Sequence, residues 1–93
     1  MLTVYKYTLA LKTGIQTIDL PTSARVIKAG IIRKQLCIWA QVDKDDTEVF
    51  SERFCIVGTG WEMEDDDYYE YDHIDSILDD PYIWHVFHLI PRR

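Results

Sequence analysis

The chain is short and acidic: its 93 residues include 16 Asp and Glu against 10 Lys and Arg, for a formal net charge of −6. With 47% hydrophobic and 13% aromatic residues, its composition is that of one globular domain over residues 1–93 and excludes an intrinsically disordered chain. The net charge argues against direct nucleic-acid binding, and no apolar run is long enough to span a membrane. The expected location is the cytoplasm.

Apolar residues alternate with polar ones through most of the chain, which is the pattern of β-strands. In the first segment Tyr5, Tyr7 and Leu9 would face one side of a sheet, with Lys6 and Thr8 on the other. In the last segment both faces are apolar, which favours a central position in a sheet. The predicted strands are, in chain order, the N-terminal segment before the turn at residues 12–14, then residues 16–20, 25–32, 35–43, 48–57 and 82–90.

Short polar connections between these segments indicate tight turns. Arg33-Lys34 is predicted to be a hairpin tip, Lys44–Thr47 a second hairpin loop, and Asp79–Pro81 a turn before the last strand. The best helical candidate is residues 72–78, and a short strand over 70–74 is the alternative. The sequence therefore predicts an all-β domain, either a small antiparallel sandwich or a partly closed barrel of about six strands. An acidic, tyrosine-rich insertion over about residues 62–80 would precede the last strand.

The two cysteines become neighbours if Lys44–Thr47 closes a hairpin, because hairpin strands pair symmetrically about their loop. Cys37 and Cys55 would then lie nearly opposite each other. One interpretation is a redox pair or half of a soft-metal site. The favoured one is two small buried thiols that pack across the strands, since free cysteine behaves as a small hydrophobic residue.

Residues that could support catalysis or metal binding are not grouped in any recognisable motif. His85 and His88 are three positions apart and would lie on opposite faces of a strand, so both cannot bind one metal ion. His73 lies among acidic residues, where its protonated form would be favoured. The segment Gly58-Thr59-Gly60 lacks the third glycine and the helix of a phosphate-binding loop. We predict that the protein is not an enzyme and holds neither a metal ion nor a cofactor.

The segment from Glu62 to Asp80 contains ten carboxylates and neither Lys nor Arg, with three tyrosines interleaved. Charged runs are usually solvated loops, and that interpretation stays open. Tyrosine, however, is enriched in interfaces and uncommon in disordered acidic loops, so a surface for a basic partner protein is the alternative. Trp61 would anchor this segment or cap a pocket beside it. The candidate partner-binding residues are Trp61, Asp65, Asp66, Asp67, Tyr68, Tyr69, Glu70 and Tyr71.

Several segments taken together resemble a family of small uncharacterised proteins from tailed bacteriophages. The segments are V-Y-K-Y-x-L (4–9), Q-T-I-D-L-P (16–21), A-R-V-I (24–27), L-C-I-W-A-Q-V-D (36–43), R-F-C-I-V-G-T-G (53–60) and W-H-V-F (84–87). The resemblance implies a phage-type accessory protein in the cytoplasm of a bacterial host cell. It implies no activity and no catalytic residue.

Three hypotheses of function follow. The leading one is a non-catalytic protein that binds and inhibits a bacterial host or defence protein, such as a CRISPR-Cas complex, through the acidic, tyrosine-rich surface. The second is a small-ligand protein that sequesters a nucleotide signal near Gly58–Trp61, which would need bases such as Arg53, Arg25 or Lys28 to converge. The third is a structural homo-oligomer, for example a homodimer, formed by pairing of edge strands.

Overall fold

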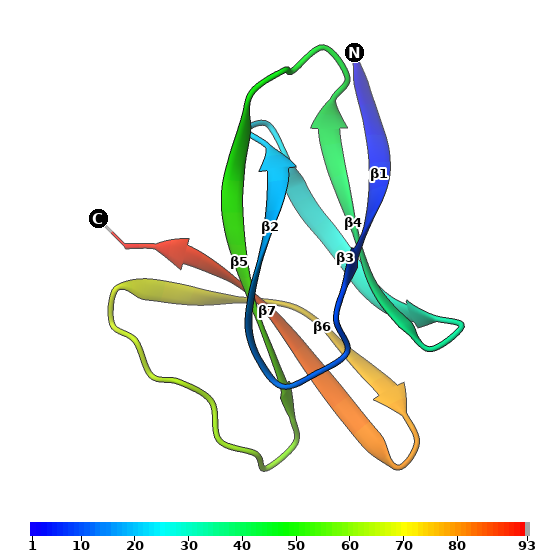
Figure 1. The fold of residues 1–93 in the computed structure, drawn as a ribbon, viewed down its shortest axis with the longest axis vertical. Helices are drawn as coiled ribbons and strands as arrows, with labels where there is room; N and C mark the ends of the chain where they lie inside the picture. Colours follow the sequence, from blue (N-terminus) through cyan, green and yellow to red (C-terminus); the bar gives the residue numbers. More distant parts are fainter. Residues whose placement is uncertain (93) are drawn as a thin grey trace.

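A computed structural model describes residues 1–92 and shows two antiparallel sheets (Figure 1). The first sheet has the order β1-β4-β3 and the second the order β2-β5-β7-β6. The strands are β1 (Leu2–Leu9), β2 (Gly14–Pro21), β3 (Arg25–Ile32), β4 (Gln35–Asp43), β5 (Val49–Gly58), β6 (Tyr69–Asp79) and β7 (Tyr82–Pro91). Over residues 1–92 there is no helix that could cross a membrane.

The all-β prediction is confirmed, and the architecture is sandwich-like, without a closed barrel in the described residues. The helical candidate over residues 72–78 is wrong, because that segment lies inside β6 and pairs with β7 at every position except Ile74. Asp80-Pro81 forms the tight turn between these two strands, as predicted. Residues 1–92 therefore form seven strands instead of about six, and the irregular part of the acidic insertion before β6 shrinks to residues 62–68.

The predicted hairpin at Lys44–Thr47 is also wrong. β4 already pairs with β1 on one side and β3 on the other, so no free edge is left for β5, and the chain crosses to the second sheet. Cys37 lies opposite Thr8 and Gly30 in one sheet, whereas Cys55 lies in the other. Both are buried free thiols, and burial raises the pKa of the Cys55 thiol.

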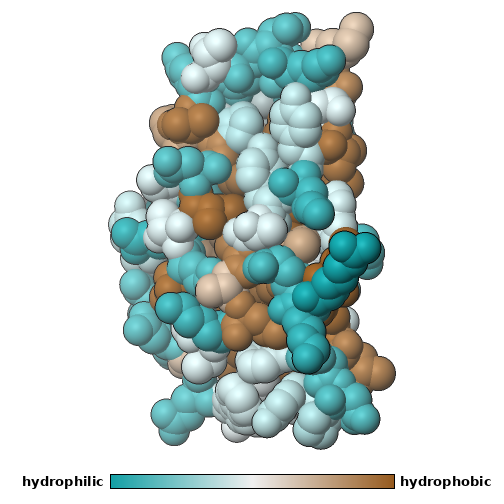
Figure 2. All heavy atoms as spheres, turned by 45° about the vertical axis from the view of Figure 1, so that its right-hand side comes forward, coloured by the Kyte–Doolittle hydropathy of each residue, from teal (hydrophilic) through white to brown (hydrophobic). Residues whose placement is uncertain are grey.

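The polar residues at this crossover hold two connections together. The Asp46 carboxylate accepts hydrogen bonds from the Thr22 hydroxyl and the Ser23 amide, each at 2.8 Å, and from the Glu48 amide at 3.1 Å. These donors lower the pKa of Asp46 to about 2. The β2–β3 turn is thereby tied to the β4–β5 connection. Figure 2 shows that this upper end is mostly hydrophilic, whereas the face below mixes hydrophobic and hydrophilic residues.

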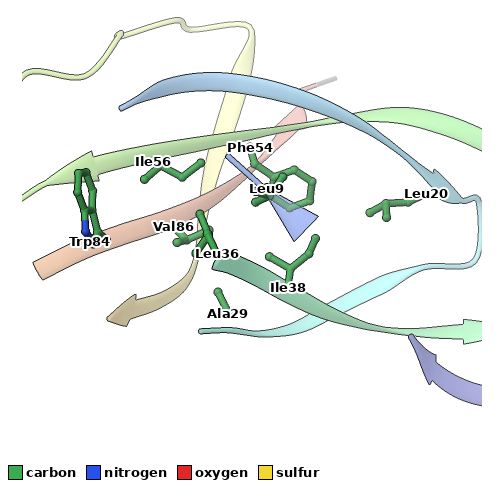
Figure 3. Close-up of a cluster of buried hydrophobic side chains, with 9 residues drawn as sticks. All are labelled: Leu9, Leu20, Ala29, Leu36, Ile38, Phe54, Ile56, Trp84 and Val86. Atoms are coloured by element: carbon green, nitrogen blue, oxygen red, sulfur yellow. The ribbon is translucent and has the colours of Figure 1, made fainter. Parts of the chain in front are cut away.

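The core lies between the two sheets. Leu36 and Ile38 of β4 point toward Phe54 and Ile56 of β5 and toward Val86 of β7 (Figure 3), and none of these five side chains is exposed. Full burial of such a side chain stabilises the fold by about 1.5–3 kcal/mol. β7 lies between β5 and β6, as its apolar faces predicted. The core therefore fixes the strands that begin and end the acidic segment.

The two sheets meet along the edge strands β3 and β6. A β-bulge between His73 and Asp75 interrupts the β6–β7 register. The Asp75 carboxylate accepts hydrogen bonds from the Lys28 ammonium at 3.2 Å and from the Ala29 amide at 3.4 Å. Burial alone would raise the pKa of Asp75, but these donors outweigh it and the pKa is lowered from 3.8. The Asp75 side chain thus provides a hydrogen-bond acceptor for the Ala29 amide on the edge of β3, which no neighbouring strand pairs with on that side.

Asp75→Ala is expected to lower the free energy of unfolding by about 1–2 kcal/mol, since a partly exposed acceptor of two hydrogen bonds is lost. The folded pKa lies below the unfolded one, so the contribution is present above about pH 4 and disappears as the pH falls through the folded pKa. Urea unfolding at neutral and at acidic pH measures both effects. Asp67→Ala, in the exposed loop, is the control. A loss that does not shrink on acidification would contradict the assignment.

Candidate partner-binding surface

Residues 61–68, here called the acidic loop, connect the end of β5 to the start of β6 along one side of the molecule (Figure 1). Every residue of the acidic loop is exposed. The loop is nevertheless held at its beginning. The Trp61 ring packs edge-on against Trp84, with centroids 5.4 Å apart, and against Tyr82 at 5.9 Å. Trp61 therefore anchors the loop to the aromatic end of the core.

Gly58 makes the close approach of Trp61 possible. A Cβ built at Gly58 would lie 2.9 Å from the nearest Trp61 ring atom, which is closer than such atoms approach. Gly60 follows with φ at +81°, a conformation that glycine adopts without strain. The Gly58-Thr59-Gly60 segment thus forms a turn. Gly58 leaves room for the Trp61 ring, and Gly60 adopts the positive φ that the turn requires.

The three consecutive aspartates of the loop differ in their surroundings. The Asp66 carboxylate accepts a hydrogen bond from the Tyr68 amide at 2.9 Å, and its carbonyl accepts one from the Tyr69 amide at 3.1 Å. Asp66 therefore shapes the turn that leads into β6. Asp65 and Asp67 flank it on the exposed chain. Glu62 and Glu64 are exposed in the same loop, so four carboxylates besides Asp66 are accessible to a partner.

The candidate tyrosines also separate into surface and interior positions. Tyr68 is 61% exposed and packs edge-to-face on Tyr69, with centroids 4.9 Å apart. The Arg53 guanidinium lies 5.4 Å above the Tyr69 ring, a cation–π contact. Tyr71 is half-buried; its hydroxyl is buried without a hydrogen-bond partner among the described residues, and burial raises its pKa. The structure thus presents Tyr68 at the surface, whereas Tyr71 packs edge-on against Phe87 of β7, with centroids 6.4 Å apart.

The acidic residues of β6 do not form one continuous acidic surface with the loop. Glu70 alternates with Tyr69 and Tyr71 along β6, so it lies on the opposite face of the sheet. Asp79 accepts a hydrogen bond from the Trp84 indole at 3.2 Å, and Asp75 bridges to β3. Of the ten carboxylates in the acidic segment, Asp66, Asp75 and Asp79 therefore accept hydrogen bonds within the fold, whereas Glu64, Asp65 and Asp67 are exposed in the loop. The sequence could not show this division, because it depends on which strand lies beside β6.

The whole chain, residues 1–93, matches a protein family described as "Domain of unknown function (DUF7352)". The chain belongs to this family. Neither the curated proteins nor the solved structures contain a match to it. Membership in DUF7352 assigns no activity, so the function has to be argued from the geometry.

Two of the hollows in this DUF7352 domain are large enough for a small ligand. One, of about 320 Å³, is lined by aromatic and small residues next to Trp61: Gly58, Thr59, Trp61, Pro81, Tyr82 and Ile83. The other, of about 340 Å³, opens between β3 and the β6–β7 pair, where Arg25 and Asp72 line it. The bases proposed for a nucleotide do not converge on the first hollow: Arg53 covers Tyr69, Arg25 lines the second hollow, and Lys28 pairs with Asp75.

The histidines on β7 face opposite sides, as the spacing predicted. His88 faces inward, stacks on Phe54 at 4.8 Å and has its Nε2 2.8 Å from Glu52. His85 faces outward and shares a hydrogen bond with Ser76. In the part of the chain that the structure describes, no three His, Cys, Asp or Glu side chains are placed to hold a metal ion together.

Proposed function

We propose that this domain is a non-catalytic, phage-type accessory protein that binds and inhibits a bacterial host or defence protein in the host cytoplasm. Its acidic loop would meet a basic surface, of the kind that a nucleic-acid-handling complex such as CRISPR-Cas presents. The observation that carries the proposal is a loop with exposed carboxylates at Glu64, Asp65 and Asp67 beside the exposed ring of Tyr68. Free acids next to an accessible aromatic ring fit a partner rich in arginine and lysine.

The anchoring of the loop supports this proposal. Trp61 holds the start of the loop against Trp84, and the Asp66 turn fixes its end at β6. A segment held at both ends loses less conformational entropy on binding than a free one, so more of the contact energy remains as affinity. The carboxylates add attraction that speeds association and weakens with salt. We therefore expect salt-sensitive binding to one basic partner.

A pull-down from bacterial lysate at low and high salt tests the proposal. The test variant is Asp65→Lys with Asp67→Lys, which leaves the structural acid Asp66 in place. The control is Asp45→Lys with Glu48→Lys, which changes the net charge equally at exposed sites in the β4–β5 connection, at the other end of the molecule (Figure 1). We expect native and control chains to capture the same protein at low salt. The loop variant should bind the purified partner about tenfold more weakly or worse. Equal binding by the loop variant would refute the proposal.

A second candidate function, binding of a nucleotide signal, is favoured only by the aromatic hollow beside Trp61. Tyr82 and Trp61 offer ring surfaces against which a base could pack. No lysine or arginine is among the described residues that line the hollow, so the phosphates would lack a cation there. A structural homodimer would instead use the edge strands β1 and β2, which border the two sheets. Thermal shifts with nucleotides and light scattering distinguish these alternatives.

A further inference from the structure

Four side chains on the outer face of the second sheet form one row of hydrogen bonds. Ser76 of β6 lies directly opposite His85 of β7, and its Oγ is 2.8 Å from His85 Nδ1. The same Oγ is 2.9 Å from Nε2 of His73, which lies three residues earlier on β6, on the other side of the bulge. His85 Nε2 is 2.7 Å from the hydroxyl oxygen of Thr59, at the root of the acidic loop. Two imidazole nitrogens thus converge on a single oxygen atom.

The Thr59 hydroxyl can accept a hydrogen bond from His85 Nε2, which would leave Nδ1 of the same ring unprotonated. When Nε2 carries the proton and donates it to the Thr59 hydroxyl, Nδ1 keeps a lone pair that points toward Ser76. His73 Nε2 points to the same place from the neighbouring strand. Histidines that bind metals have this arrangement: one nitrogen faces the ion, and the other is hydrogen-bonded to a group that orients the ring.

We propose that His73 and His85 form a two-histidine binding site for a borderline divalent transition ion such as Zn²⁺, with Thr59 orienting His85. Ser76 is exposed, and its small side chain can rotate away from the two rings. The ion then occupies the space between them. Zn–N bonds are ~2.0–2.1 Å long, shorter than the 2.8 and 2.9 Å contacts that the two nitrogens make with Ser76 Oγ, so both rings would turn toward the ion.

The rest of the coordination shell belongs to water. No third His, Cys, Asp or Glu side chain of residues 1–92 joins these two histidines. His88 is excluded because it faces the interior, stacked on Phe54. The site is therefore open and has one protein ligand fewer than the three of catalytic zinc sites, while the net charge of −6 attracts cations to the protein. The pair that converges is His73 with His85, which the sequence spacing of His85 and His88 did not suggest.

Calorimetric titration of the full chain with Zn²⁺ tests the site. We expect one ion per chain, with at least about tenfold weaker binding in His73→Ala and in His85→Ala. Thr59→Val, which removes the orienting oxygen but keeps the shape, should weaken binding about tenfold. Ser76→Ala should retain binding, and so should the control His88→Gln. Equal Zn²⁺ binding by native chain and both alanine variants would show that the ion binds elsewhere and overturn the proposal.

Nitrogen NMR of the histidine side chains keeps the test decisive if a variant fails to fold. In the native chain, Zn²⁺ should shift the resonances of His73 Nε2 and His85 Nδ1 far more than those of His88. No shift at either histidine, or shifts no larger than those of His88, would overturn the proposal.

Discussion

Phe54→Ala is expected to lower the free energy of unfolding by about 3–5 kcal/mol, the usual cost of deleting a large buried ring. Phe54 is not exposed at all, lies at the centre of the core between the sheets and stacks on His88 at 4.8 Å. Its removal leaves a cavity that β-strands, fixed by their ladders, cannot easily close. A domain of this size has about 5–10 kcal/mol of stability in total, so the variant should be close to unfolding at physiological temperature.

Phe50→Ala is the matched control for this prediction. Phe50 lies on the same strand four residues earlier and on the same face, but its side chain is 62% exposed. Its replacement should cost less than about 1 kcal/mol, because little apolar surface returns to water. Urea unfolding followed by tryptophan fluorescence measures both variants. Similar losses for Phe50 and Phe54 would show that the burial difference does not control stability here.

The local features of the fold could be predicted from the sequence. Alternation located the strands, and the Arg33-Lys34 tip of the β3–β4 hairpin was correct; both residues have positive φ, as tight hairpin turns require. Pairing between distant strands could not be predicted, because alternation shows which residues share a face but not which strand lies alongside. Lys44–Thr47 has the composition of a hairpin loop, yet Asp46 uses its oxygens to tie the crossover to Thr22 and Ser23.

The candidate partner-binding surface could likewise be predicted only in part, because its details depend on contacts between distant strands. The sequence identified the acidic segment and its tyrosines, but it could not separate acids used within the fold from free ones. Asp75 is structural only because β3 lies beside β6, a contact between residues 47 positions apart. The convergence of His73 and His85 on Ser76 likewise depends on the β6–β7 register, in a segment for which a helix was the competing prediction.

Gly58→Ala is expected to destabilise the protein by about 1–3 kcal/mol, because the new methyl group would lie 2.9 Å from the Trp61 ring and force one of them to move. The double-mutant cycle with Trp61→Ala isolates this contact. In the Trp61→Ala background the same glycine substitution should cost little, since the ring that it meets is gone. Thermal and urea unfolding of the four proteins provide the cycle.

The cycle also connects the fold to the proposed function. If the clash displaces Trp61, the acidic loop loses the contact with Trp84 that holds its start, and Asp65 and Asp67 are no longer presented in a fixed position. Gly58→Ala should then weaken partner capture, although it changes no charge and no loop residue. An equal cost of Gly58→Ala with and without the Trp61 ring would mean that the glycine serves the β5 backbone instead. The loop would then be anchored by its other end, at the Asp66 turn.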